Sequence, residues 1–447
     1  MENASLRTLL THSSKLTLKQ LTVVGAGWAG LAAAVAATQA GWQVRLFEAS
    51  KMAGGRARRL SETFAGQPLD NGQHILIGAY KDTLSLMRTV GLDPGALLHR
   101  MPLDLRFHDD TGLRLPDWPM PMNFLAGMVR AQGWTHSDKL HLLLAAWQWQ
   151  HANYQCTATL TVAQLCTQAR ISSRVMHQLI EPLCLSALNT PMEEASASVF
   201  LRVLHDALWL GPGSSDLLIP KVDLGALLPD ACLQWLSTHG AEIHVGQRQI
   251  ASDIAALQQQ AAQNSRQAVL LACPPWEAAR LSADISPKWS ASCAQLSHTA
   301  IATVYLRCTD AGFNGLARPM VALHSNAQKP AQFVFDRGAL SGQPGLLAAV
   351  VSACQTDRDD LTQSVQAQVC AALGLNEAHV VQTVVEKRAT FACTAGLDRP
   401  ESSIADGLWA CGDYIQGPYP STLEGAVRSG QQVVTQLDQV LHSQRLR

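Results

Sequence analysis

Near its start the chain reads Leu21-Thr-Val-Val-Gly25-Ala-Gly27-Trp-Ala-Gly30, an apolar run followed by three glycines spaced as GxGxxG. An alanine-rich segment follows, and the strand-like stretch after it ends in Glu48. In such a strand–turn–helix unit the first glycine allows a tight turn, the second lets the backbone approach a pyrophosphate, and the third lets helix and strand pack closely. An acid about twenty residues further on accepts the ribose hydroxyls. This order predicts a Rossmann-like α/β domain that binds a dinucleotide through Gly25, Gly27, Gly30 and Glu48, with the pyrophosphate at the helix N-terminus.

A second glycine-rich turn follows Glu48 almost at once, in Met52-Ala-Gly54-Gly55-Arg56-Ala-Arg58-Arg59. A guanidinium group binds phosphate through two parallel hydrogen bonds, and neighbouring glycines leave room for the phosphate. We therefore predict a second phosphate contact from Gly54, Gly55 and Arg56. The alternative interpretation is a solvated basic turn.

A third block stands near the end of the chain, where an apolar strand leads into Gly412-Asp413 and a proline-rich loop leads into Thr422-Leu423-Glu424-Gly-Ala. A carboxylate at Asp413 can accept a hydrogen bond from a ribityl hydroxyl. Free N–H groups at a helix N-terminus can face the part of a flavin ring that becomes negative on reduction. We predict that the flavin end of FAD is bound by Gly412, Asp413, Thr422, Leu423 and Glu424, and that Gly72 lies where backbone passes the ring. An ordinary capped helix is the alternative.

Composition limits the remaining classes. The net charge is −1 over 447 residues, which gives no case for nucleic acid as a partner. The eleven cysteines include no CxxC pair, so we expect reduced thiols, no disulfide framework and no metal site. No stretch reaches the ~18–20 apolar residues of a membrane span. We expect a cytoplasmic protein that can still rest on a membrane, at the inner face of the plasma membrane.

The order of the patterns predicts a discontinuous FAD-binding domain with an inserted α+β substrate domain. Helical periodicity is expected over 124–154 and 161–210, and a final helix over 423–441. Alternating or apolar runs predict a second, largely antiparallel sheet from 302–307, 332–335, 346–351 and 380–386. The predicted segments are a flexible extension at 1–19, the FAD-binding domain at 20–88, 222–288 and 400–447, and the substrate-binding domain at 89–221 and 289–399.

These motifs carry a family resemblance over nearly the whole chain. The Glu48 and Gly54-Gly55-Arg56 arrangement resembles the FAD motif of the amine oxidase and phytoene desaturase superfamily. Within it, the chain is most similar to the hydroxysqualene dehydroxylases, the squalene-associated flavoproteins of bacterial hopanoid pathways, in Asp70-Asn-Gly-Gln-His74, Pro274-Pro-Trp276 and Gly417-Pro-Tyr-Pro-Ser-Thr-Leu-Glu-Gly-Ala. The resemblance implies FAD as cofactor, an adenine contact near Gln249, and an isoprenoid lipid substrate.

The resemblance further implies reductive removal of the hydroxyl of hydroxysqualene to give squalene, by hydride transfer from reduced flavin. Hydroxide is a poor leaving group, so a proton donor must reach the substrate oxygen. His74 is the first candidate, and Tyr80 and Tyr419 are the next; each also has a purely structural interpretation. The allylic cation needs an apolar pocket that excludes water. Because the chain has no second GxGxxG, we expect an external electron donor or a separate reductase.

The Trp- and Met-rich stretch from Trp118 to Trp149 is a candidate gateway for a lipid at a bilayer interface, with a helical core as the alternative. Three rival functions remain open. A carotenoid-type desaturase would transfer hydride from substrate to FAD. An amine oxidase often has an aromatic residue two positions before the Glu-Gly-Ala, where this chain has Thr422. A non-catalytic flavoprotein is the rival from another class.

Overall fold

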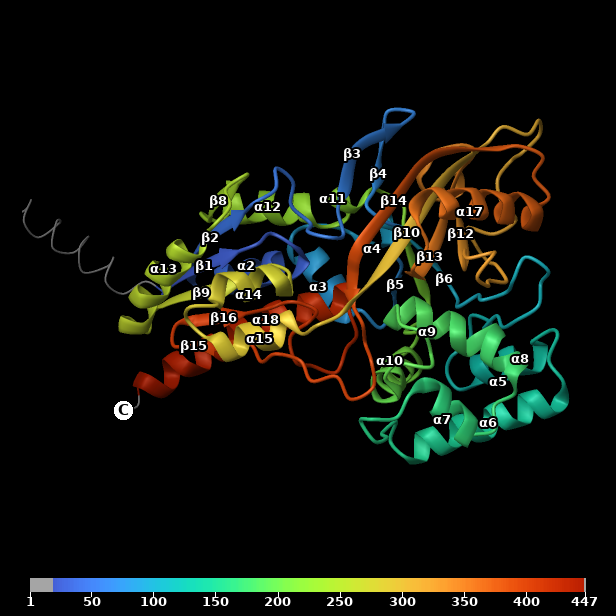
Figure 1. Ribbon diagram of the computed structural model, residues 1–447, viewed down its shortest axis with the longest axis horizontal. Helices are drawn as coiled ribbons and strands as arrows, with labels where there is room; N and C mark the ends of the chain where they lie inside the picture. Colours follow the sequence, from blue (N-terminus) through green and yellow to red (C-terminus); the bar gives the residue numbers. More distant parts are fainter. Residues whose placement is uncertain (1–18, 446–447) are drawn as a thin grey trace, which may run out of the picture.

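The computed structural model describes residues 19–445, and a six-stranded sheet carries the first glycine-rich turn (Figure 1). Its strands lie in the order β15-β16-β9-β1-β2-β8. All neighbours are parallel except β15 and β16. The Rossmann-like prediction is confirmed. The bounds are β1 Lys19–Val24, β2 Trp42–Glu48, β8 Glu242–Val245, β9 Gln267–Leu271, β15 Ser403–Ala405 and β16 Leu408–Ala410.

Helices cover this sheet on both faces (Figure 1). Helix α2, Trp28–Gln39, is apolar nearly all round, and such a helix is stable only when buried. It packs against the final helix α18, Leu423–Arg445, which runs four residues past the predicted end. The two ends of the chain therefore meet beside the sheet. The other helices here are α3 Lys81–Thr89, α4 Pro94–Leu97, α11 Leu224–Leu227, α12 Pro229–Thr238, α13 Ala251–Gln263, α14 Pro275–Ser282 and α15 Pro287–Ala294.

The second predicted sheet is confirmed as five antiparallel strands in the order β11-β12-β13-β10-β14. Its long strands β10 and β14 connect it to the first sheet (Figure 1). The bounds are β10 His298–Cys308, β11 Met320–Ala322, β12 Phe333–Asp336, β13 Leu346–Cys354 and β14 Ala378–Phe391, with α16 Arg337–Ser341 and α17 Arg358–Leu373 beside them. Smaller sheets contain β3 Arg59–Phe64 with β4 Gln67–Asp70, and β5 Leu76–Ile77, β7 Leu217–Pro220 and β6 Leu98–Met101.

The helical periodicity expected over 124–154 and 161–210 is confirmed, and each stretch is divided into several helices. Thr135 forms a capping box that starts a new helix within the first stretch, and Thr161 forms one at the start of the second. Asn189, with φ 47°, ends another helix in the left-handed conformation. The elements are α5 Met122–Arg130, α6 His136–His151, α7 Val162–Gln168, α8 Ser173–Val175, a π-helical turn at Met176–Ile180, α9 Glu181–Leu188 and α10 Ala197–Trp209.

Two predictions, the N-terminal extension and the domain boundaries, are not tested by the structure. The flexible extension at 1–19 lies outside the described residues except for Lys19, which already belongs to β1 and pairs with Asp438 at 2.8 Å. The domain boundaries stay a prediction.

All eleven cysteines are free thiols. Within residues 19–445, no helix combines the length and apolar character needed to span a bilayer.

Candidate active site

One cavity of about 800 Å³ begins at the carboxyl ends of β1, β2 and β9 and continues to the second sheet. Most of the residues predicted to bind FAD, together with two of the three candidate acids, line it. Gly30, Glu424 and Tyr419 do not. The lining members are Gly25, Gly27, Glu48, Gly54, Gly55, Arg56, Gly72, His74, Tyr80, Gln249, Gly412, Asp413, Thr422 and Leu423. Their roles as FAD contacts stay predictions.

The two glycine-rich turns lie against each other. Gly25 has φ +114°, a conformation that side chains rarely adopt, and a Cβ on Gly30 would lie 2.0 Å from the carbonyl oxygen of Gly25. The N–H of Gly54 donates to the carbonyl of Ala26 at 2.8 Å. A backbone cradle therefore forms at the start of α2, where the helix dipole favours a phosphate, and its shape fits a dinucleotide.

Glu48 lies at the end of β2, as predicted. Its two carboxylate oxygens accept hydrogen bonds from the N–H groups of Ala26 and Ser50, at 2.7 and 2.8 Å. These bonds fix the carboxylate at the cavity wall, and each oxygen retains a further lone pair for a ribose hydroxyl.

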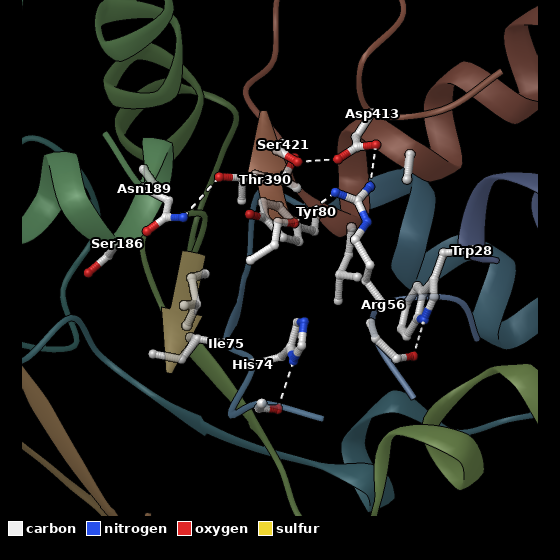
Figure 2. Close-up of a pocket in the computed structure, with 18 of the residues that line it drawn as sticks. Trp28, Arg56, His74, Ile75, Tyr80, Ser186, Asn189, Thr390, Asp413 and Ser421 are labelled. Carbon is white, nitrogen blue, oxygen red and sulfur yellow. Dashed lines mark hydrogen bonds and ion pairs between the residues drawn. The ribbon is translucent and has the colours of Figure 1, made fainter. Parts of the chain in front are cut away.

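Arg56 reaches across the cavity instead of standing free for a phosphate. Its guanidinium donates to the carboxylate of Asp413 at 2.5 Å and to the carbonyl of Ala389 at 2.7 Å. Asp413 also accepts from the hydroxyl of Ser421. The two segments predicted to hold opposite ends of FAD are thus joined by an ion pair (Figure 2).

Glu424 points away from the cavity. Its buried carboxylate accepts from the backbone N–H groups of Asp82 and Thr83, at 3.1 and 2.9 Å, and from the Thr83 hydroxyl at 2.7 Å. These N–H groups belong to the first turn of α3, so Glu424 caps that helix and fixes the start of α18 beside it. Burial raises the pKa of Glu424. Any contact of this residue with FAD comes through its backbone.

Tyr419 also lies outside the cavity. Its hydroxyl donates to Asp206 at 2.6 Å and accepts from Arg202 at 3.0 Å. This placement argues against Tyr419 as the proton donor, because its hydroxyl is already held by a carboxylate on α10. Local sequence patterns do not reveal this pairing, because it joins residues 213 positions apart.

His74 presents one nitrogen to the cavity. Its Nδ1 lies 2.9 Å from the carbonyl oxygen of Gly72, and since a carbonyl can only accept, Nδ1 carries a hydrogen. The Nε2 atom is left for a ligand (Figure 2). Burial, with the nearby Arg56 charge, lowers the pKa of His74, so the neutral ring dominates near neutral pH.

Tyr80 lies across the same part of the cavity (Figure 2). Burial, reinforced by the charge of Glu424, raises the pKa of its phenol well above the usual value. Tyr80 therefore keeps its hydroxyl proton at physiological pH and can donate a hydrogen bond.

Beyond these residues the cavity becomes an apolar chamber. Its wall comes from α5, α6, α9, α10 and the second sheet. A polar pair missed by the sequence analysis, Asn189 and Thr390, interrupts this wall. The sequence analysis did not single out Asn189, although Asn followed by Thr-Pro is typical of a helix end. The apolar lining includes Leu103, Leu105, Leu113, Leu115, Phe124, Leu142, Trp149, Leu179, Ile180, Leu183, Phe200, Leu204, Met320, Phe333 and Phe335.

The fold and the cavity define the class of the protein. A glycine-rich turn at a parallel sheet edge, an acid at the next strand and a second glycine–arginine turn form the cradle of a dinucleotide. The cradle opens into an apolar chamber where a substrate can meet the flavin. The protein is an FAD-dependent oxidoreductase.

Comparison with known proteins agrees. Residues 28–438 match the family described as flavin containing amine oxidoreductase, and the chain belongs to this family. It is 26% identical over 442 residues to a hydroxysqualene dehydroxylase of Zymomonas mobilis, and 26% identical over 434 residues to one of Rhodopseudomonas palustris. Both alignments cover 92% of this chain and 96% of the relative. An oxidoreductase structure from Methanosarcina mazei has a similar fold, with a TM-score of 0.66 at 15% identity, over 93% of this chain and 100% of the other.

Proposed function

We propose that this protein is a hydroxysqualene dehydroxylase, which reductively removes the hydroxyl of hydroxysqualene to form squalene for hopanoid synthesis. The observation that carries the proposal is the continuity of the cavity, which runs from the dinucleotide cradle at Gly27 into a chamber lined by leucines and phenylalanines. Such a wall suits a long isoprenoid chain, because moving the apolar surface of the chain out of water and into the chamber is favourable. The similarity to the curated relatives over 92% of the chain supports the same reaction.

The reaction places clear demands on the residues of the chamber. FAD bound in the cradle and reduced would supply a hydride to the substrate carbon. The carbon–oxygen bond breaks, and the oxygen takes a proton and leaves as water. The apolar wall keeps other water from the cation. His74 Nε2 takes up a proton from solvent and passes it to the substrate oxygen. An external donor would then return two electrons to the bound flavin.

A panel of substrates tests the proposal. The FAD-loaded protein is incubated with hydroxysqualene and a chemical reductant, with phytoene and a quinone acceptor, and with cyclohexylamine and oxygen. We expect squalene from the first mixture and no product from the other two. Desaturated phytoene, or cyclohexanone from the amine, would replace the proposal with one of the rival functions.

We also propose that the protein docks on a lipid bilayer through one face of α5 and α6. Both helices have two apolar sides. Phe124 on α5, and Leu142 and Trp149 on α6, line the chamber. The opposite sides expose apolar residues to solvent, with Val129 76% exposed. Exposed apolar groups beside a chamber for a lipid fit a membrane surface. This face consists of Met122, Leu125 and Val129 on α5, Leu140, Leu144 and Trp147 on α6, and Trp118 in the segment before α5.

The proposed face corrects the gateway expected from the sequence. Met128, Trp134 and Trp149 are buried, so they belong to the core and not to a bilayer contact. Flotation with phosphatidylcholine–phosphatidylglycerol vesicles tests the remaining residues in a Met122→Ser/Val129→Ser/Leu144→Ser variant. We expect the wild type to float and this variant to stay in the dense fraction. A matched Val245→Ser/Val380→Ser/Val440→Ser variant, which changes exposed valines on other elements, should float. Equal flotation of all three proteins contradicts the docking face.

A further inference from the structure

A small polar cluster lies in the wall of the apolar chamber. It consists of Asn189 at the end of α9, Thr299 on β10 and Thr390 on β14. The Asn189 side-chain nitrogen donates to the hydroxyls of Thr299 and Thr390 at 3.0 and 2.9 Å, and the two hydroxyls lie 2.7 Å apart. Asn189 Oδ1 accepts from the N–H of Ala353 at 2.6 Å. Asn189 and Thr390 line the cavity (Figure 2), whereas Thr299 is not part of its lining.

One hydroxyl hydrogen of this cluster has no acceptor within the cluster. The Asn189 amide has two hydrogens, and each already has a threonine oxygen as its acceptor. One threonine hydroxyl donates to the other, so one hydroxyl hydrogen remains. When Thr299 is the donor, Thr390 accepts two hydrogen bonds and keeps its own hydrogen for the cavity. A hydroxyl that accepts twice is polarised into a stronger donor.

The position of Thr390 places this hydroxyl between the two parts of the cavity. The preceding residue, Ala389, accepts from the Arg56 guanidinium at 2.7 Å, beside the predicted flavin contacts. Asn189, the partner of Thr390, ends α9, and α9 and α10 supply apolar lining residues such as Leu183 and Phe200. An apolar substrate with a single hydroxyl needs one polar partner at this border, because a buried hydroxyl without a partner is costly.

We propose that Thr390 binds the hydroxyl oxygen of the substrate by donating a hydrogen bond, and that Asn189 and Thr299 position Thr390 for this contact. The inference rests on the proposed function, since it names the group that recognises the hydroxyl of hydroxysqualene. The contact holds the carbon that loses oxygen at the border with the flavin end of the cavity. It also distinguishes substrate from product, because squalene has no oxygen to accept the bond.

Binding to the oxidised FAD-loaded protein tests the proposal without turnover, through the change in flavin absorbance. Wild type should bind hydroxysqualene about tenfold more tightly than squalene, which is the effect of one hydrogen bond in an apolar site. Thr390→Val should remove this preference and leave squalene affinity unchanged, whereas Thr390→Ser should retain it. In turnover, Thr390→Val should raise KM for hydroxysqualene about tenfold.

The matched control is Thr383→Val. Thr383 lies on the same strand and forms a similar hydroxyl pair with Thr362 at 2.8 Å, outside the cavity. This control should keep the wild-type preference. Equal wild-type affinities for hydroxysqualene and squalene, together with normal conversion, overturn the Thr390 inference alone, even if Thr390→Val does not fold. A preference that survives in folded Thr390→Val overturns it as well. A wild type that neither binds nor converts hydroxysqualene overturns the proposed function, and the inference with it.

Discussion

The Arg56 guanidinium lies 2.5 Å from the Asp413 carboxylate and joins residues 357 positions apart in the sequence. The side chain of Asp413 is 8% exposed and that of Arg56 is 28% exposed, so the pair is largely shielded from solvent. Asp413 comes shortly after strand β16, and Arg56 comes directly after the second glycine-rich turn. The predicted flavin end of the site is therefore assembled only when the segments around Arg56 and Asp413 meet.

Replacement of Arg56 by Gln should weaken FAD binding. The change removes a charged donor from the cavity and leaves the Asp413 carboxylate without its cation. A hydrogen bond to a charged group is worth ~1.5–3 kcal/mol, so we expect the Kd of FAD to rise about 10- to 100-fold. Titration of the apoprotein with FAD, followed by flavin fluorescence, measures the change. Arg174→Gln, which breaks an ion pair with Asp138 on the helical side, is the control. Unchanged affinity in Arg56→Gln contradicts the account of the site.

Alanine substitutions at Gly30 and Gly27 should have different effects, the first on the free energy of unfolding and the second on FAD binding. A Cβ on Gly30 would lie 2.0 Å from the Gly25 carbonyl oxygen, so Gly30→Ala should lower the free energy of unfolding by about 1–3 kcal/mol. A Cβ on Gly27 would lie 3.8 Å from the nearest heavy atom, the Cα of Gly55, so Gly27→Ala should fold normally. It should still weaken FAD binding, because the methyl group occupies the approach of the pyrophosphate. Urea unfolding of the apoproteins and FAD titration measure the two effects. A Gly27→Ala protein with wild-type FAD affinity contradicts a pyrophosphate at this turn.

His74 gives the reaction a defined pH dependence. Its pKa is lowered below the usual 6.5 by burial, and the acid form is the one required. The value of kcat/KM should therefore rise as the pH falls towards the lowered pKa, by up to about tenfold per unit, and then level off. His74→Gln should abolish turnover and spare FAD binding. His205→Gln changes a half-exposed histidine paired with Asp206 and serves as the control. Near-normal turnover in His74→Gln with a full flavin complement excludes His74 as the acid.

Asp70 should make stability depend on pH. Burial raises the pKa of this carboxyl from 3.8 to about 7, even though the N–H of Leu224 donates to it and Arg337 lies 3.7 Å away. Between these two values the folded chain binds more protons than the unfolded chain. The Asp70 contribution to the free energy of unfolding is therefore full below pH 4 and is lost as the pH rises to 7, by up to ~4 kcal/mol.

Urea unfolding of wild type and Asp70→Asn at several pH values measures this contribution. The difference between the two unfolding free energies should change across this range, because the asparagine does not titrate. Parallel pH profiles for the two proteins would show that Asp70 is not the titrating group.

The sequence was sufficient to predict those parts of the fold that depend on the spacing of residues within one short segment. Gly25, Gly27 and Gly30 follow one strand and open one helix, so their turn is encoded within a single short segment. The alternating apolar residues of β10 and β14 likewise indicated strands, because each strand buries alternate side chains. FAD and the oxidoreductase class followed from these segments and the matching block at the end of the chain.

Other features depend on packing between distant segments, which one sequence does not encode locally. Glu424 stands beside the predicted flavin contacts in sequence, yet its side chain caps α3. Tyr419 is held by Asp206, and the pair Asn189 and Thr390 meets only when α9 packs on the second sheet. The Trp-rich stretch divides for the same reason: Trp149 is buried and Trp147 is exposed, two positions apart on one helix.

The most direct test of the central claim is an anaerobic single turnover. The FAD-loaded protein is photoreduced, hydroxysqualene is added, and flavin absorbance is followed while the lipids are extracted and quantified. The account predicts that the flavin is reoxidised and that one squalene is formed per flavin. If the reduced flavin persists and no squalene forms, the protein is not a hydroxysqualene dehydroxylase; bleaching of the oxidised flavin by a polyene precursor would identify a desaturase instead.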